Sequence, residues 1–128
     1  MNDLTNLEMI EKAKTVLRPR KLSNDNSAGT VACALLSSKG NLYLGVCIDV
    51  SSSLGFCAEH SAIAAMITAG ESRIAKIVAI SSDGKVLPPC GRCREFMFQI
   101  DTKNFTLTNV ILGEDNVVKL QELLPYYP

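Results

Sequence analysis

Two short cysteine-bearing stretches hold the residues of this chain that are best suited to chemistry. The first contains Cys57 and Glu59, and the second contains Cys90 and Cys93 in a Pro-Cys-x-x-Cys arrangement. Each stretch is predicted to open a helix, and the positive end of a helix dipole stabilises a thiolate. Two such helix ends placed side by side would gather three thiolates at one point, which is an arrangement suited to zinc.

The two stretches together hold three cysteines. This number favours a catalytic zinc site, which has three protein ligands and leaves the fourth position to water. Cys57, Cys90 and Cys93 supply three ligands, and Glu59 follows closely enough to reach that water. Two alternatives stay open. His60 would close a structural zinc site, but Glu59 would then have only the dipole-complementing role of an acidic residue in a first helical turn. A redox Cys-x-x-Cys pair would leave Cys57 unexplained.

The pairing of Cys57-Ala58-Glu59 with Pro89-Cys90-Gly91-Arg92-Cys93 resembles the cytidine deaminase family in its cysteine-first form. The resemblance runs from about Val31 to Leu124. It implies a three-layer α/β/α sandwich, one Zn²⁺ per chain and a homotetramer. The activity it implies is hydrolytic deamination of a free cytosine-type nucleoside, cytidine or deoxycytidine, to the uridine product and ammonia.

The resemblance also implies roles for the motif residues. Glu59 is expected to be the general acid/base: it takes a proton from water and delivers it to N3 of the cytosine ring as hydroxide attacks C4, and it then helps ammonia to leave. Ala58 and Pro89 are expected to bind the ring through backbone groups, although a proline at a helix start is also common for structural reasons.

A cation near the sulfurs is expected, because three thiolates exceed the charge of Zn²⁺ by one. Many family members carry Arg directly after the Glu, where this chain has His60. We therefore expect Arg92, between the two later ligands, to compensate the thiolate charge, with His60 as the second candidate. Tyr126 and Tyr127 fall where an aromatic tail commonly covers a neighbouring subunit's site in this family.

The sugar-binding half of the pocket departs from the family pattern. Cys47 and Asp49 fall where many members carry an Asn-x-Glu pair that binds the ribose 3′-hydroxyl, and a thiol is a poor substitute for an amide. The aromatic residue that covers the base in those enzymes falls near Gly29. These departures also resemble blasticidin S deaminase, which acts on a cytosine-containing antibiotic. A non-catalytic zinc-stabilised binding domain is the rival from another class.

Length and composition limit the number of domains and the classes of substrate and compartment that fit this chain. The 128 residues predict a single domain over 1–128. The 13 basic and 13 acidic residues cancel, which favours a small-molecule substrate over nucleic acid. Apolar runs are too short for a membrane span of ~18 residues, and we expect no secretion signal. The spacing of the five cysteines is not that of a disulfide-stapled domain, which favours the reducing cytoplasm.

The elements that must position these residues follow from apolar periodicity and turn residues. Strands are predicted over residues 29–37, 42–50, 74–81, 105–112 and 117–119. Helices are predicted over residues 3–17, 58–69 and 92–99, with a last helical turn over 120–124. This order predicts an α/β protein with a mixed five-stranded sheet and helices on both faces. The two cysteine-bearing helices must run parallel if they are to meet at the carboxyl end of the strand over 74–81.

Overall fold

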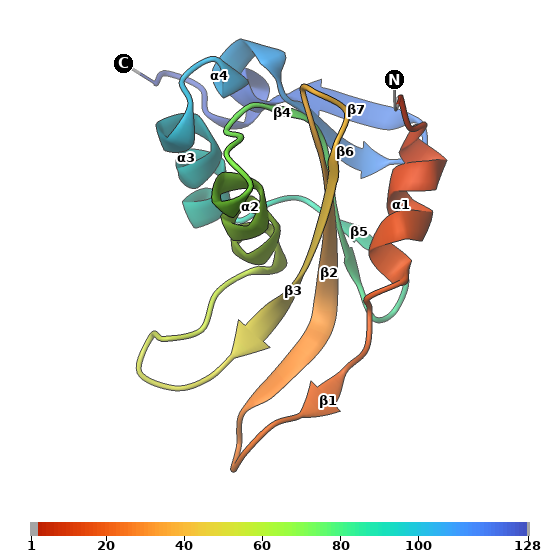
Figure 1. The fold of residues 1–128 in the computed structure, drawn as a ribbon, viewed down its shortest axis with the longest axis vertical. Coiled ribbons are helices and arrows are strands. Elements are labelled where there is room, and N and C mark those ends of the chain that lie inside the picture. The colour runs from red at the N-terminus through yellow and green to blue at the C-terminus, as the bar shows by residue number, and fades with distance from the viewer. Residues whose placement is uncertain (1–2, 128) are drawn as a thin grey trace.

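A mixed sheet forms the middle layer of the computed structural model, which describes residues 3–127 (Figure 1). Its strands are β1 (Arg20–Lys21), β2 (Ser27–Ser37), β3 (Leu42–Asp49), β4 (Ile74–Ser81), β5 (Val86–Leu87), β6 (Asn109–Gly113) and β7 (Asn116–Lys119). The antiparallel partners of β2 are β3 on one side and β4 and β1 on the other. The pairing of β4 with β6 is parallel, and β5 and β7 pair antiparallel with β4 and β6.

Among residues 3–127 the sheet therefore has seven strands, and the predicted five-stranded sheet is wrong in this respect. The two extra strands, β1 and β5, are two residues long, which is too short to show the alternation that indicates a strand in a sequence. They form because the edges of β2 and β4 offer backbone partners to the chain as it passes. The predicted class, a mixed sheet between helices, is confirmed.

Helices cover both faces of the sheet (Figure 1). On one face lies α1 (Asn6–Lys14), which begins with a Thr5–Glu8 capping box and buries Met9 and Ala13. The helices on the other face are α2 (Ala58–Thr68) and α3 (Gly91–Ile100). Two buried clusters result, one on each side of the sheet, because alternate residues of β2 and β4 point to opposite faces. Within residues 3–127, none of the helices has the length and apolar character needed to cross a membrane.

The segment after α3 corrects a second prediction. Residues 105–112 were expected to form one strand, but α4 (Asn104–Leu107) occupies the first half and β6 begins only at Asn109. The cause is a buried Asn104, whose side chain accepts a hydrogen bond from the Ile74 N–H and donates to the carbonyls of Ser72 and Met97. These contacts hold the chain in a helical turn beside the start of β4. The chain ends in a 3₁₀ turn, η1 (Leu120–Leu123).

The starts of α2 and α3 lie together at the carboxyl end of β4, as predicted. Cys57 and Cys90 are the N-cap residues of the two helices, and both have extended backbone conformations. Gly45 of β3 lets α2 approach closely, because a Cβ at this position would lie 2.4 Å from the Ala62 nitrogen. This close approach positions the first turns of α2 on the sheet.

Candidate active site

Three sulfur atoms meet where α2 and α3 begin. The Sγ atoms of Cys57, Cys90 and Cys93 all lie within 4.8 Å of one another. Cys57 Sγ is 3.5 Å from Cys90 Sγ, which is 3.3 Å from Cys93 Sγ. Cys93 is buried, Cys57 is half-buried and Cys90 is exposed, so the cluster faces outward on one side. The sequence-predicted ligand set is thus brought together.

The helix ends alone do not ionise this cluster. Burial, followed by the charge of Glu59, raises the pKa of the Cys93 thiol far above its usual range. Burial and the neighbouring Cys90 thiol also raise the pKa of Cys57. Burial acts in the same direction on Cys90, but hydrogen bonds from the Cys93 N–H and the neighbouring thiols leave its pKa lowered. Three adjacent sulfurs become thiolates together only beside a compensating cation, and the soft sulfur donors fit zinc.

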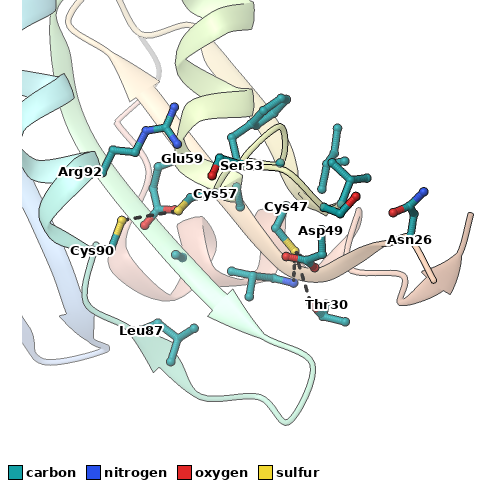
Figure 2. Close-up of a pocket in the computed structure, with 18 of the residues that line it drawn as sticks. Asn26, Thr30, Cys47, Asp49, Ser53, Cys57, Glu59, Leu87, Cys90 and Arg92 are labelled. Carbon is teal, nitrogen blue, oxygen red and sulfur yellow. Dashed lines mark hydrogen bonds between the residues drawn. The ribbon is translucent and has the colours of Figure 1, made fainter.

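Glu59 lies beside the sulfurs, in the first turn of α2 (Figure 2). Its side chain is buried, with only 5% of its surface exposed, and burial raises the pKa of its carboxyl group. Hydrogen bonds from its own backbone N–H and from Cys93 oppose this rise. Among residues 3–127, the cluster of potential metal ligands consists of the three cysteines, without Glu59 or His60. Glu59 is therefore placed to exchange protons next to the cluster.

His60 and Arg92, the two candidate cations, occupy different positions. His60 Nδ1 lies 3.4 Å from Cys93 Sγ, and its ring stacks on Phe96 with the centroids 4.4 Å apart. Burial, and after it the positive charge of Arg92, lower the pKa of His60. Arg92 is exposed and lines the pocket in front of the sulfurs (Figure 2). His60 thus makes the contact with a sulfur that the sequence led us to expect from Arg92.

A pocket of about 830 Å³ opens in front of the sulfur cluster. Cys57, Ala58, Glu59 and Cys90 line the end near the cluster. The rest of its wall consists of residues from β2 to β5, from the loops that follow β1, β3 and β5, and from the first turn of α3: Asn24, Asp25, Asn26, Thr30, Val31, Cys47, Ile48, Asp49, Val50, Ser51, Ser53, Gly55, Phe56, Ala79, Leu87, Pro88 and Arg92. The predicted substrate-binding residues Ala58, Cys47 and Asp49 are therefore all on this wall.

Pro89 is placed differently from the other predicted binding residues. Pro88 lines the pocket, whereas Pro89 is buried and its carbonyl accepts a hydrogen bond from Arg94 Nε at 2.8 Å. Arg94 also donates to the carbonyl of Leu123 in η1, so it ties the start of α3 to the C-terminal turn. Pro89 thus has a structural contact in the loop that carries Cys90, and its role in ring binding stays a prediction.

Sequence reasoning missed several pocket residues. Phe56 is the one aromatic side chain among the described residues of the pocket wall, and its position directly before Cys57 was the available signal. An aromatic residue cannot replace Gly29, because a Cβ there would lie 2.1 Å from the Arg18 carbonyl oxygen. Thr30 also lines the pocket, and no local sequence pattern indicates this because its orientation depends on an irregular strand pairing.

The aromatic residues at the C-terminus differ from each other in exposure. Tyr127 packs on Phe98 and donates a hydrogen bond to Glu95 within the same chain. Tyr126 is fully exposed. Tyr127 therefore closes over α3 of its own chain, and Tyr126 alone has the exposure that contact with another subunit would need.

A three-cysteine cluster at two helix starts, with a buried carboxyl group in a pocket, has the composition of a catalytic metal site within this α/β/α protein. Residues 5–109 match the family described as the cytidine and deoxycytidylate deaminase zinc-binding region. The chain therefore belongs to this family, whose members are zinc-dependent hydrolases.

Individual relatives agree with the family assignment. The chain is 32% identical over 99 residues to the cytidine deaminase of Halalkalibacterium halodurans, covering 74% of each protein. A 70-residue match to the cytidine deaminase of Mycobacterium tuberculosis is 33% identical and spans only about half of either protein, 54% of this chain and 53% of the relative. The crystal structure of cytidine deaminase from Mycobacterium leprae superimposes with a TM-score of 0.79 at 25% identity, covering 96% of this chain and 99% of that one.

Proposed function

We propose that this chain is a single zinc-dependent domain that deaminates a free cytosine-type nucleoside, cytidine or deoxycytidine. The observation that carries the proposal is the placement of buried Glu59 beside three clustered cysteines at one end of a large pocket, with no fourth potential ligand in the cluster among residues 3–127. A site of three ligands leaves room for water and substrate, as catalytic zinc sites do.

Cys57, Cys90 and Cys93 would hold one zinc ion per chain. Zinc bound there would supply Lewis acidity, which makes water a stronger acid near neutral pH. Glu59 performs the proton transfers: its carboxylate takes a proton from the attacking water and delivers it to N3 of the ring. As the water oxygen bonds to C4, Glu59 carries a further proton to the amino nitrogen, and the C4–N bond breaks to release ammonia. The upward shift that burial gives the pKa of Glu59 suits a group that must hold a proton between these steps.

His60 is the group that best supports charge compensation at the cluster. Its contact with Cys93 and its stacking on Phe96 hold the Nδ1 atom against a sulfur atom, and the Nδ1–H tautomer would donate a hydrogen bond to a thiolate there. Arg92 is better placed to face the substrate, because it lines the pocket. A hydrogen bond to a thiolate withdraws part of its charge, and this compensates the third thiolate without making His60 a ligand.

The proposal also covers the oligomeric state, the cellular compartment and a second candidate substrate. A homotetramer, as the family resemblance implies, is supported by an apolar outer surface of α2 on which Ala64, Ala65 and Ile67 are exposed. Thiolate ligands favour a reducing cytoplasm. Blasticidin S deamination is a second candidate, supported by the exchange of the usual Asn-x-Glu pair for Cys47 and Asp49.

The deciding experiment measures zinc content and ammonia release on the same purified protein. We expect one zinc per chain and turnover of cytidine or deoxycytidine that is lost in Glu59→Gln with zinc retained. Blasticidin S and deoxycytidylate complete the substrate panel. Zinc binding without turnover of any of the four compounds would favour the binding-domain alternative, with His60 as the fourth ligand.

A further inference from the structure

The pairing of β2 with β3 is irregular at the wall of the pocket. Ala28 pairs with Ile48 and Ala32 pairs with Val46, so the three residues 29–31 of β2 lie opposite Cys47 alone. Gly29 has a φ of +84°, a backbone conformation that glycine adopts without strain. Bulges of this kind redirect side chains and leave backbone groups without a partner in the sheet ladder. Here the bulge brings residues 30 and 31 to face the side chain of Cys47.

Cys47 is the centre of a small hydrogen-bond network (Figure 2). Its Sγ atom lies 3.3 Å from Thr30 Oγ1, 3.3 Å from the Val31 nitrogen and 3.5 Å from Asp49 Oδ2. The Val31 N–H can only donate, and an ionised Asp49 can only accept. The thiol proton therefore lies toward Asp49, and the Thr30 hydroxyl donates to the sulfur. The hydrogen bonds run in one direction, from Thr30 through Cys47 to Asp49.

Cys47 and Asp49 differ in exposure, and this decides which of them can contact a ligand. Cys47 is only 6% exposed, so its sulfur offers little surface to a ligand. Asp49 is exposed and lines the pocket, on the same face of β3 as Cys47 because the two are two residues apart on a strand. A carboxylate accepts about four hydrogen bonds, so the contact with Cys47 leaves Asp49 able to accept from a substrate.

We infer that Cys47 is a positioning residue: held by Thr30 and the Val31 N–H, its thiol orients Asp49 toward a hydrogen-bond donor on the substrate. This inference rests on the proposed function, because the cytosine ring must occupy the end of the pocket at the sulfur cluster. The part of the substrate beyond the ring then reaches Asp49. That part carries a hydroxyl group at this point, because a carboxylate can only accept a hydrogen bond and would repel an anionic group.

The test compares cytidine with its 2′-, 3′- and 5′-deoxy analogues. In the wild-type protein, loss of the hydroxyl that faces Asp49 should raise KM about 10- to 100-fold with little change in kcat. Asp49→Ala and Cys47→Ala should reduce this penalty to about threefold or less, because the acceptor is absent or misdirected. Cys47→Ser should keep the penalty, since a serine hydroxyl can replace the thiol hydrogen bonds. Val46→Ala is the control, because Val46 lies next to Cys47 but points to the other face of β3.

Several results would overturn the inference. Equal KM values for cytidine and all three analogues would show that Asp49 recognises no hydroxyl. If Cys47→Ala kept the full rise in KM on loss of the hydroxyl, or if Cys47→Ser lost it, the thiol would not position Asp49 through hydrogen bonds. Crystal structures of the Cys47→Ala and Cys47→Ser variants provide a readout that does not depend on turnover: the Asp49 side chain must keep its orientation in the serine variant only. If no cytosine compound is deaminated by the wild type, the proposed function fails, and the Asp49 orientation still decides the positioning role.

Discussion

The Nδ1 atom of His60 lies 3.4 Å from the Sγ atom of Cys93, on an imidazole ring that stacks against Phe96. The stacking keeps the ring from turning away, so the contact with the sulfur is built into the packing of α2 against α3. His60 thus takes a place beside the predicted metal ligands without joining their cluster.

We predict that His60→Ala weakens zinc affinity about 10- to 100-fold, as loss of a hydrogen bond to a metal ligand commonly does. Competition with a chelator of known zinc affinity measures the change. His60→Arg should recover most of the affinity, because arginine also donates hydrogen bonds and carries charge. A larger loss in Arg92→Gln than in His60→Ala would instead assign the compensating role to Arg92.

Replacement of any one of the three clustered cysteines by Ala should abolish stoichiometric zinc binding. Two sulfurs cannot form the three-ligand site, and the apo protein should unfold at a lower temperature because it lacks a ligand that binds only the folded state. Zinc per chain after dialysis, measured by elemental analysis, gives the result. Cys33→Ala is the matched control, because Cys33 is a buried cysteine of β2 outside the cluster. Full zinc content in a Cys57, Cys90 or Cys93 variant would remove that residue from the ligand set.

Glu59→Gln should keep zinc and lower kcat about 10²- to 10⁴-fold, the usual contribution of a general acid/base. Glutamine has nearly the same shape as glutamate but cannot exchange the proton. Ammonia release and zinc content are measured on the same preparation. Glu95→Gln is the control, since Glu95 lies on α3 and hydrogen-bonds to Tyr127 and Gln99 rather than to the pocket residues. Turnover within threefold of wild type in Glu59→Gln would leave the proton transfers to another group.

The parts of the fold that could be predicted are those with long, regular patterns. The strand Ile74–Ser81 was predicted with its observed bounds, and the helix after Cys57 ends one residue earlier than expected. Both segments are buried and apolar, and turn residues mark where they end. The meeting of Cys57 with Cys90 followed from the same elements, because helices on one face of a sheet begin at the same end when they run parallel.

The features that could not be predicted depend on contacts between distant segments. The turn at Asn104 exists because its side chain bonds to Ser72 and Ile74, about thirty residues earlier. The hydrogen bonds of Cys47 require a strand bulge that contains Gly29, and Gly29 lies against the backbone of Arg18. Local sequence patterns contain no information on either contact, so the predicted strand over 105–112 was wrong and the role of Thr30 went unnoticed.

Asp101 should make the stability of the protein fall on acidification. Its carboxylate accepts hydrogen bonds from the Lys103 N–H, the Ser72 hydroxyl and Arg73 Nε, joining the end of α3 to the start of β4. Burial raises the pKa of Asp101, but these bonds outweigh it and leave the pKa below its usual value. The stabilisation is therefore present above the unfolded-state pKa, about 3.9, and is lost as the pH falls through the lower folded-state pKa.

Urea titrations from pH 7 down to about pH 2 test whether Asp101 causes the loss of stability at low pH. Asp101→Asn should be less stable than wild type at neutral pH, and the two proteins should converge at the acid end. Ser72→Ala removes one of the three hydrogen bonds and should lie between them. A constant difference between Asp101→Asn and wild type across the whole range would show that the carboxylate charge does not contribute.

Gly45→Ala should disturb the metal site from a distance, because this position sets how closely α2 lies on β3. An added Cβ would lie 2.4 Å from the Ala62 nitrogen and 2.8 Å from the Ala58 carbonyl oxygen, so α2 must move away. Overpacking of this kind costs about 1–3 kcal/mol of stability. Since α2 carries Cys57 and α3 carries the other two cysteines, the movement also separates the sulfurs, and zinc affinity should fall together with stability.

The matched control is Gly113→Ala, where an added Cβ would meet only the Asn116 Cβ at 3.7 Å, an ordinary contact. Urea unfolding of the apo proteins measures stability, and chelator competition measures zinc affinity on the same variants. Because substitution at Gly113 leaves both helix starts in place, its zinc affinity should equal that of the wild type. If Gly45→Ala were destabilised but bound zinc as tightly as wild type, the position of α2 on β3 would not control the distance between the sulfurs.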